Sequence, residues 1–161
     1  MTQSVTTTLL WFSAIGCGMM AGLYFAFSAF IMTALGRIPQ VHGISAMQAI
    51  NTTILRSLFM PLFWGTTLAA LALAGLALFR LGETAATAML TAGILYVAGM
   101  FVCTVTFNVP LNNALDAADP SGAEAAAVWA RYLKDWTFWN HLRTVASAAA
   151  SALFVVALVA R

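Results

Sequence analysis

Charged side chains are nearly missing from this chain of 161 residues. Only 7% of the residues are charged and 62% are apolar, whereas a soluble domain has about 25% charged and roughly 45–50% apolar residues. So few charges cannot keep the surface of a folded chain of this length in water, and so apolar a chain does not stay disordered. The composition therefore excludes a soluble globule and indicates an integral membrane protein.

The chain also lacks the sequence patterns of several kinds of site. It has no basic run and a net charge of only +2, so nucleic acid is not an expected partner. It contains no Gly-rich phosphate loop, no CxxC, no HExxH and no GxSxG. Its two cysteines, Cys17 and Cys103, lie in apolar stretches, so neither a disulfide framework nor a zinc site is expected. No paired carboxylates lie in the apolar stretches, which argues against a proton-relay pump.

Four long runs without any charged residue are present, and they decide the expected architecture. They cover residues 1–36, 57–79, 84–115 and 144–160. Because a membrane-spanning helix needs about 20 apolar residues, we predict four spans in a single domain of residues 1–161. The predicted spans are about 8–35, 61–80, 85–107 and 141–160. Alternation with period two, typical of barrel strands, is absent. The fold class is therefore predicted as an all-α bundle of four transmembrane helices.

Two of the connections are longer than tight turns. Between spans one and two, apolar residues recur at spacings of 3 and 4 from Ile44 to Leu58, which predicts a short amphipathic helix that ends before Pro61. Between spans three and four, Asn112 to Gly122 is rich in Asn, Asp, Pro and Gly, which predicts a loop. From Glu124 the pattern stays helical to the C-terminus over roughly 55 Å, so the fourth helix extends out of a hydrocarbon core of about 30 Å.

The charges are distributed unevenly between the two sides of the predicted bundle. Both long connections lie on one side, and both termini lie on the other with the short turn at 80–84. The side with the long connections carries five of the seven Lys and Arg residues, namely Arg37, Arg56, Arg131, Lys134 and Arg143. The positive-inside rule therefore predicts that the long connections are cytoplasmic.

The densest group of polar and aromatic residues lies where the fourth span begins. Trp129, Tyr132, Trp136, Trp139 and Arg143 follow one another at spacings of 3 and 4, so they share one helix face. One interpretation is an aromatic belt at the membrane interface, with the basic residues held by lipid headgroups. The other interpretation is a functional site, because unpaired polar groups at this depth are costly. Asn140, His141 and Arg143 favour a site, since they occur together at the mouth of a span.

The end of the third span carries a second polar group, around Pro110. Proline cannot donate a main-chain hydrogen bond and leaves a carbonyl free about one turn earlier. Asn108 and Asn112 either cap such a carbonyl or point their amides into a cavity, and Asn51 on the connecting helix is equally ambiguous. All three lie on the same side of the membrane as Asn140, His141 and Arg143. We therefore predict that the six side chains converge on one shared pocket.

The two histidines allow one cofactor hypothesis. His42 and His141 both belong to the side with the long connections, so they could together hold a haem iron. Solvated loop histidines are more common than haem ligands, so no cofactor is the expectation and haem is the alternative.

Four segments resemble one family when taken together and in order. They are AGLYFAFS at 21–28, AMQAIN at 46–51, NVPLN at 108–112 and WTFWNHLR at 136–143. This set resembles the anthrone oxygenase-like family of small four-helix membrane proteins, over about Phe12 to Val156. One departure is Arg56–Ser57, where many relatives have Asn-Pro.

The resemblance implies an oxidation of anthrones to anthraquinones with dioxygen, without a dedicated redox cofactor. Many members are bacterial, so the resemblance also implies a bacterial inner membrane as the location. Many of these bacterial members have no assigned reaction. The lipid bilayer and an apolar aromatic molecule are then the expected partners, and the sequence leaves open whether the chain forms a homo-oligomer. The alternative is a non-catalytic membrane protein that binds haem, a quinone or another apolar ligand.

The candidate residues suit this chemistry, which starts with removal of a proton from the carbon opposite the ketone. Histidine is the side chain that accepts a proton most readily near neutral pH, so His141 is the expected base. Arg143 and Asn140 are expected to stabilise the developing oxyanion. Substrate binding is expected from Asn51, Asn108, Asn112, Tyr132, Trp136 and Trp139, in which the amides donate hydrogen bonds and the rings stack on a flat substrate.

Overall fold

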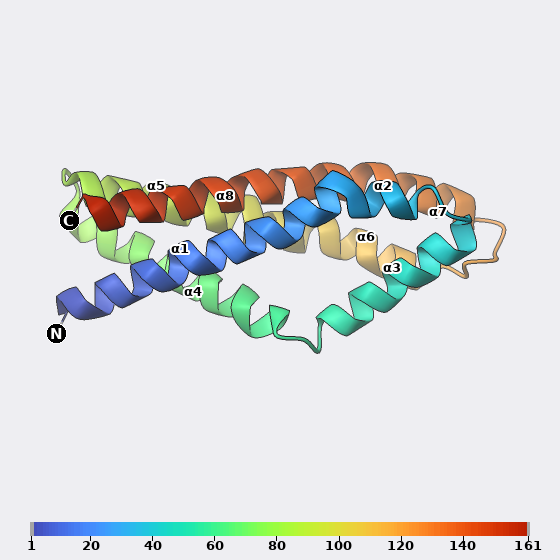
Figure 1. Ribbon diagram of the computed structural model, residues 1–161, viewed down its shortest axis with the longest axis horizontal. Helices are drawn as coiled ribbons and strands as arrows, with labels where there is room; N and C mark the ends of the chain where they lie inside the picture. The colour runs from blue at the N-terminus through green and yellow to red at the C-terminus, as the bar shows by residue number, and fades with distance from the viewer. Residues whose placement is uncertain (1, 161) are drawn as a thin grey trace.

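Four long helical rods form the molecule, as the computed structural model shows for residues 2–160 (Figure 1). Four helices within this part of the chain are long and apolar enough to cross a membrane: Gln3–Leu35, Phe59–Arg80, Thr84–Asp116 and Ala125–Val159. The predicted all-α bundle of four transmembrane helices is confirmed, and the chain is an integral membrane protein. The fourth rod is 35 residues long, which agrees with a helix that extends out of the membrane.

Each rod except the second contains π-helical turns. The elements of the first rod are α1 (Thr2–Ala26), η1 (Phe27–Ile31) and α2 (Met32–Leu35). The third rod consists of α5 (Thr84–Tyr96), η3 (Val97–Val102), η4 (Thr104–Asn108) and α6 (Val109–Asp116), and the fourth of α7 (Ala125–Arg131), η5 (Tyr132–Trp136) and α8 (Thr137–Val159). The π-helical elements are η1, η3, η4 and η5. Such turns are rare and frequently mark functional sites.

The second rod is shorter than the others, and the connecting helix completes it. It consists of α4 (Phe59–Ala77) and a final turn η2 (Leu78–Arg80), and α3 (Gln40–Ile54) precedes it. In Figure 1, α3 runs back from the end of the bundle where α2 finishes, and α4 continues to the opposite end. The corner between them points away from the bundle axis. The two helices therefore resemble one antiparallel rod that is broken at residues 55–58.

The break corrects the predicted end of the connecting helix. The periodicity extends to Leu58, but α3 ends at Ile54. The main-chain N–H of Ser57 bonds to the carbonyl of Ile54, and the Ser57 hydroxyl accepts a hydrogen bond from the N–H of Phe59 (3.1 Å). A serine that satisfies main-chain groups locally favours the end of a helix over its interior. Leu55 and Leu58 are consequently exposed at the corner.

The third rod continues further than predicted. The predicted loop starts at Asn112, whereas α6 runs to Asp116 and the loop covers 117–124. Pro110 lies in the first turn of α6, directly after the π-helical η4. Proline fits this place because the first turn of a helix does not need its missing N–H.

Both termini lie at the same end of the bundle as the turn between α4 and α5 (Figure 1). The start of α3 and the loop before α7 lie at the opposite end. The predicted grouping of the two long connections on one side is therefore confirmed. α4 has 19 residues, which corresponds to about 28 Å and matches a hydrocarbon core of about 30 Å. The corner between α3 and α4 thus lies near one boundary of that core, and the longer rods continue beyond it.

Close packing of the rods depends on small residues. At Gly93 of α5, an added Cβ would lie 2.7 Å from the Cβ of Ala74 and 2.8 Å from the carbonyl oxygen of Ala70, both in α4. Small residues at such positions let helix backbones approach closely in lipid. The contact between α4 and α5 therefore has no room for a methyl group at position 93.

Replacing Gly93 by alanine should lower the free energy of unfolding by about 1–3 kcal/mol, the usual effect of overpacking. The methyl group would push α5 away from the carbonyl of Ala70, which belongs to a rigid helix. Gly75→Ala is the matched control, because a Cβ there has no heavy atom within 4 Å. Chemical denaturation of the detergent-solubilised variants measures both effects. A Gly93→Ala protein as stable as the Gly75→Ala control would contradict the packing.

Candidate functional site

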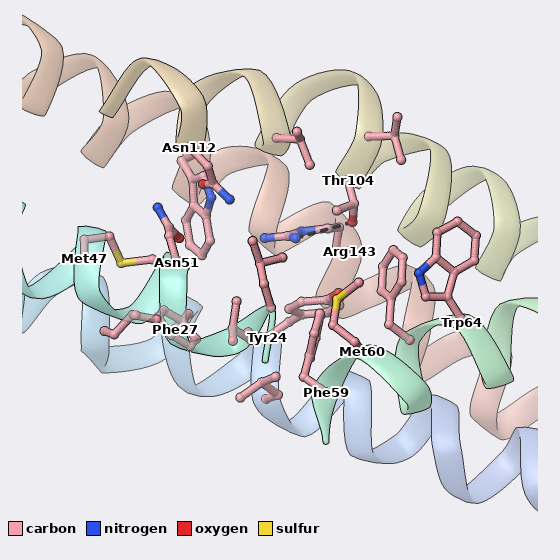
Figure 2. Close-up of a pocket in the computed structure, with 18 residues that line it drawn as sticks. Tyr24, Phe27, Met47, Asn51, Phe59, Met60, Trp64, Thr104, Asn112 and Arg143 are labelled. Atoms are coloured by element: carbon pink, nitrogen blue, oxygen red, sulfur yellow. Dashed lines mark hydrogen bonds between the residues drawn. The ribbon is translucent and has the colours of Figure 1, made fainter. Parts of the chain in front are cut away.

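A cavity of about 240 Å³ lies at the corner between α3 and α4 (Figure 2). Its wall is mainly apolar and aromatic, with Phe27, Met47, Phe59, Met60 and Trp64 among the lining residues. The polar lining residues are Tyr24, Asn51, Thr104, Asn112, Trp136 and Arg143. An apolar cavity with a few convergent polar groups is the usual form of a small-molecule site, and the volume is near the lower end of the range of about 300–1,000 Å³.

Arg143 is the only charged residue that lines the cavity within the described chain, and its side chain is 4% exposed. Its guanidinium carbon lies 4.3 Å from the ring centroid of Tyr24 and 5.1 Å from that of Trp136. Two aromatic faces therefore hold the cation between α1 and η5, and such contacts are worth about 2 kcal/mol each where water is excluded.

No carboxylate neutralises this arginine. Across residues 2–160 the one ion pair joins Arg131 and Asp135, whose side chains are partly exposed. Arg143 instead donates from Nη2 to the Asn140 side-chain oxygen (2.7 Å) and weakly from Nη1 to the Thr104 hydroxyl (3.4 Å). A buried charge without an opposite charge is expensive in a membrane bundle and marks a functional site by default. The cavity is therefore suited to an anion or to an oxygen that develops negative charge.

Asn140 lies behind the cavity wall and holds Arg143 in place. It is fully buried, and its amide nitrogen donates to the carbonyl of Tyr24 and to the hydroxyl of Ser28, both at 2.7 Å. Its side-chain oxygen accepts the hydrogen bond from Arg143. Asn140 thus joins α1 to α8 and orients the guanidinium, but it does not line the cavity.

Asn112 is held at the cavity by Tyr132. The Tyr132 hydroxyl donates to the Asn112 side-chain oxygen (2.9 Å), and the Tyr132 ring stacks between Trp129 and Trp136 with centroid distances of 5.9 and 5.5 Å. This stack fixes Trp136, which lines the cavity. Tyr132 itself is buried behind these residues and does not line it.

Asn108 acts as a cap and not as a cavity residue. It is fully buried and donates from Nδ2 to the main-chain carbonyl of Trp136 (3.2 Å). It therefore ties η4 to η5 across the two rods, which agrees with the capping interpretation, although the carbonyl belongs to the neighbouring rod.

The predicted convergence holds for part of the set. Asn51, Asn112 and Arg143 line one cavity, and Asn108 and Asn140 support its wall from behind.

His141 does not join them, because its side chain is exposed. Asn140 and Arg143, three residues apart, face the bundle, so the residue after Asn140 is turned by about 100° toward the outside. His42 on α3 is exposed as well, and neither histidine lines the cavity.

The aromatic residues also divide into two groups. Trp129, Tyr132 and Trp136 are buried in the bundle, so an aromatic belt facing lipid is the wrong interpretation for them. Trp139 is half-buried and stacks on Phe107 at 3.7 Å between ring centroids, away from the cavity. Its expected role in stacking on a substrate is not what the geometry favours.

Two polar lining residues were not singled out from the sequence. Tyr24 belongs to the AGLYFAFS segment, and a tyrosine in an otherwise apolar span was the available signal. Thr104 lies four residues before Asn108 and so shares a face with it. Three of the four π-helical elements lie around the same place, since Phe27 of η1, Thr104 of η4 and Trp136 of η5 all line the cavity.

These features define a four-helix membrane protein with a buried, unneutralised arginine beside an apolar cavity. The family model "Anthrone oxygenase" matches residues 53–153, and the chain belongs to this family. The matched range contains α4, the NVPLN segment and Arg143. No curated protein and no solved structure gives a significant match to the chain.

Proposed function

We propose that the protein is a cofactor-independent oxygenase that converts an anthrone-type ketone into the corresponding quinone with dioxygen. The observation that carries this proposal is Arg143, a buried cation without a carboxylate partner at the wall of an aromatic cavity. The reaction passes through an enolate, and the arginine supplies the positive charge that stabilises it.

The surroundings of the cavity suit an apolar substrate. Leu55, Trp64, Val105 and Val109 line the cavity and are also exposed on the outer surface of the bundle. These residues are apolar and come from three separate segments, so the opening between them faces lipid at the level of the corner. A flat aromatic ketone dissolved in the bilayer can therefore enter sideways.

The chemistry follows from the donors at the wall. Binding of the ketone oxygen by the Arg143 guanidinium lowers the free energy of the enolate formed when the opposite carbon loses a proton. The enolate gives one electron to dioxygen, and the two radicals combine into a carbon–oxygen bond. The resulting peroxide takes up a proton, then loses its second C–H proton while the O–O bond breaks. One oxygen atom becomes the new carbonyl and the other leaves as water, so the reaction is a monooxygenation without an external reductant.

The first proton needs only a transient acceptor, because the peroxide takes a proton up again. No histidine, aspartate or glutamate lines the cavity in the described part of the chain. We therefore assign the transient acceptor to water at the mouth of the cavity, and we attribute the acidity of the substrate carbon to the binding of the ketone oxygen by Arg143. This assignment replaces His141 as the base.

Turnover by the purified protein tests the proposal directly. Detergent-solubilised protein should accelerate the oxidation of anthrone, with one dioxygen consumed for each anthraquinone formed. Oxygen uptake and the quinone absorbance measure the two quantities in one sample. If the rate equals that of detergent alone, the proposed function is wrong and the cavity belongs to a protein that only binds a ligand.

His141→Ala should keep the turnover of the wild type to within about twofold. Removal of a general base usually lowers the rate by about 10²–10⁴-fold, but an exposed side chain outside the cavity cannot make the required contact. The measurement is the same anthrone assay, with the thermal unfolding of both proteins compared in parallel. A folded His141→Ala protein with a hundredfold lower rate would restore histidine to the mechanism.

A further inference from the structure

Arg143 keeps its positive charge inside the bundle, because a guanidinium is not deprotonated in proteins. Its hydrogen bonds go to two neutral side chains, those of Asn140 and Thr104. The one ion pair in the described part of the chain lies on the surface and does not involve Arg143. A charge in a membrane bundle is normally paired, since an unpaired one is costly. The described residues supply no opposite charge, so a bound anion is the partner that suits this site.

The mouth of the cavity restricts the kind of anion. The apolar residues that line the cavity and are also exposed are Leu55, Trp64, Val105 and Val109. They face lipid near the boundary of the hydrocarbon core. A small ion such as chloride would lose its water there without gaining apolar contacts. An amphiphile already lies at this boundary, with its charged end toward water and its chain in lipid. The mouth therefore favours an anion that is carried on an apolar chain.

The size of the cavity restricts the ligand further. Its volume of about 240 Å³ is near the lower end for ligand sites, and its wall is mainly apolar. A phospholipid would bring its phosphate, glycerol and headgroup into this space, at the cost of unpaired polar groups. A fatty acid brings one carboxylate on a single chain. The part of the chain that the cavity does not hold stays in lipid beyond the mouth.

We infer that Arg143 binds the carboxylate of a long-chain fatty acid from the bilayer, and that the chain leaves the cavity through the mouth. In Figure 2 the guanidinium lies among the side chains that line the cavity. A planar guanidinium binds a carboxylate through charge-assisted hydrogen bonds, which are about twice as strong as those between neutral groups. The inference rests on the charge and the cavity, and it does not require the proposed oxidation.

One consequence does rest on the proposed function. The fatty acid occupies the place at Arg143 that the ketone oxygen takes in the oxidation. Fatty acids should therefore inhibit turnover competitively with anthrone, which links the activity to the free fatty acid content of the membrane.

Laurate and 1-dodecanol test the inference, because the two molecules have the same chain and differ in charge. Each is titrated into the full chain in a non-ionic detergent at about pH 8, where a free carboxyl group is ionised. The rise in unfolding temperature gives each affinity. Hydrogen bonds to charged partners correspond to roughly a 10- to 100-fold gain in affinity. The Kd of laurate should be lower than that of dodecanol by a factor in this range, and dilauroyl phosphatidylglycerol should bind no better than dodecanol.

Arg143→Gln removes the charge that distinguishes the two ligands. The affinities of this variant for laurate and dodecanol should agree to within about threefold. The matched control is Arg131→Gln, because Arg131 is exposed and does not line the cavity. The control should retain the full preference for laurate.

A second pair of variants tests the path of the chain. Val105 and Val102 are both exposed on the third rod, and of the two Val105 alone lines the cavity. Val105→Trp fills the mouth and should weaken laurate binding by roughly 5-fold or more, the usual effect of overpacking. Val102→Trp should bind laurate as the wild type does.

The outcomes separate this inference from the proposed function. Equal wild-type affinities for laurate and dodecanol, or equally tight binding of phosphatidylglycerol, would overturn the inference. A preference for laurate that persists in Arg143→Gln would overturn it too, and equal binding by the two tryptophan variants would do so if Arg143→Gln does not fold. A wild type that prefers laurate but does not oxidise anthrone would keep the inference and reject the oxygenase. A wild type that oxidises anthrone without preferring laurate would do the opposite.

Discussion

Replacing Arg143 by glutamine should lower the rate of anthrone oxidation by about 10²–10³-fold, the usual effect of removing one oxyanion donor. The guanidinium is the one charge at the cavity wall in the described chain, and Tyr24 and Trp136 hold it there. Glutamine retains a donor but not the charge that stabilises the enolate. Arg143→Lys should recover part of the loss only, because an ammonium group cannot reproduce the planar set of donors.

Arg131→Gln is the matched control for this experiment. Arg131 is exposed and pairs with Asp135 on the surface, so the control should oxidise anthrone at the wild-type rate. Neutralising Arg143 also relieves the burial of a charge, so the variant should remain folded. A folded Arg143→Gln protein with wild-type turnover would remove the arginine from the mechanism.

Replacing Asn140 by leucine should lower the free energy of unfolding by about 3–5 kcal/mol and should also reduce turnover. The change removes three side-chain hydrogen bonds, the buried ones to Tyr24 and Arg143 and the partly buried one to Ser28. Hydrogen bonds between membrane helices average about 0.6 kcal/mol, and an unpaired buried group adds about 1–3 kcal/mol. Denaturation in detergent measures the first effect, and the anthrone assay at a temperature where the variant is folded measures the second.

Ser28→Ala provides a graded comparison. It removes one of the three partners, together with the longer contact between the hydroxyls of Ser28 and Thr144 (3.3 Å), and leaves the hydrogen bond between Asn140 and Arg143 in place. We expect a loss of about 0.6 kcal/mol in the free energy of unfolding and turnover close to that of the wild type. Asn140→Leu should lose more turnover than Ser28→Ala for each kcal/mol of stability that is lost. If this ratio is the same in the two variants, the proposal that Asn140 orients Arg143 is wrong.

The spans were predictable because lipid imposes a simple rule on the sequence. Charges are excluded from long runs such as 1–36 and 84–115, and the helices Gln3–Leu35 and Thr84–Asp116 occupy most of these two runs. Arg143 and Asn112 were predictable as site residues for the same reason, since polar groups near lipid need a partner. In both cases the constraint concerns which residues are buried, and burial is visible as a pattern along one helix.

The cavity was not predictable, because it arises where two helices end and not where one helix presents a face. Ser57 ends the pattern that begins at Ile44 through a local hydrogen bond, and periodicity carries no signal for that bond. His141 shows a related limit. A histidine at this place suggested a general base. One residue along a helix corresponds to a turn of about 100°, so His141 points outward when Asn140 points inward. Only the packing of α8 shows which of its faces is inside.

The break between α3 and α4 places the residues that shape the cavity apart from the residues that pack α1 against α8. The side chains of Ile54, Leu55 and Met60 at the corner line the cavity, and they lie outside α1 and α8, the two helices that make the most extensive contact in the bundle. Substitutions at the corner can change the shape of the cavity while the packing between α1 and α8 stays intact. The corner also contains Arg56–Ser57, where the chain departs from the sequence pattern it resembles. Residues 55 and 56 of this segment can therefore be substituted to reshape the cavity wall without changing any residue of α1 or α8, and the local hydrogen bonds of Ser57 are kept.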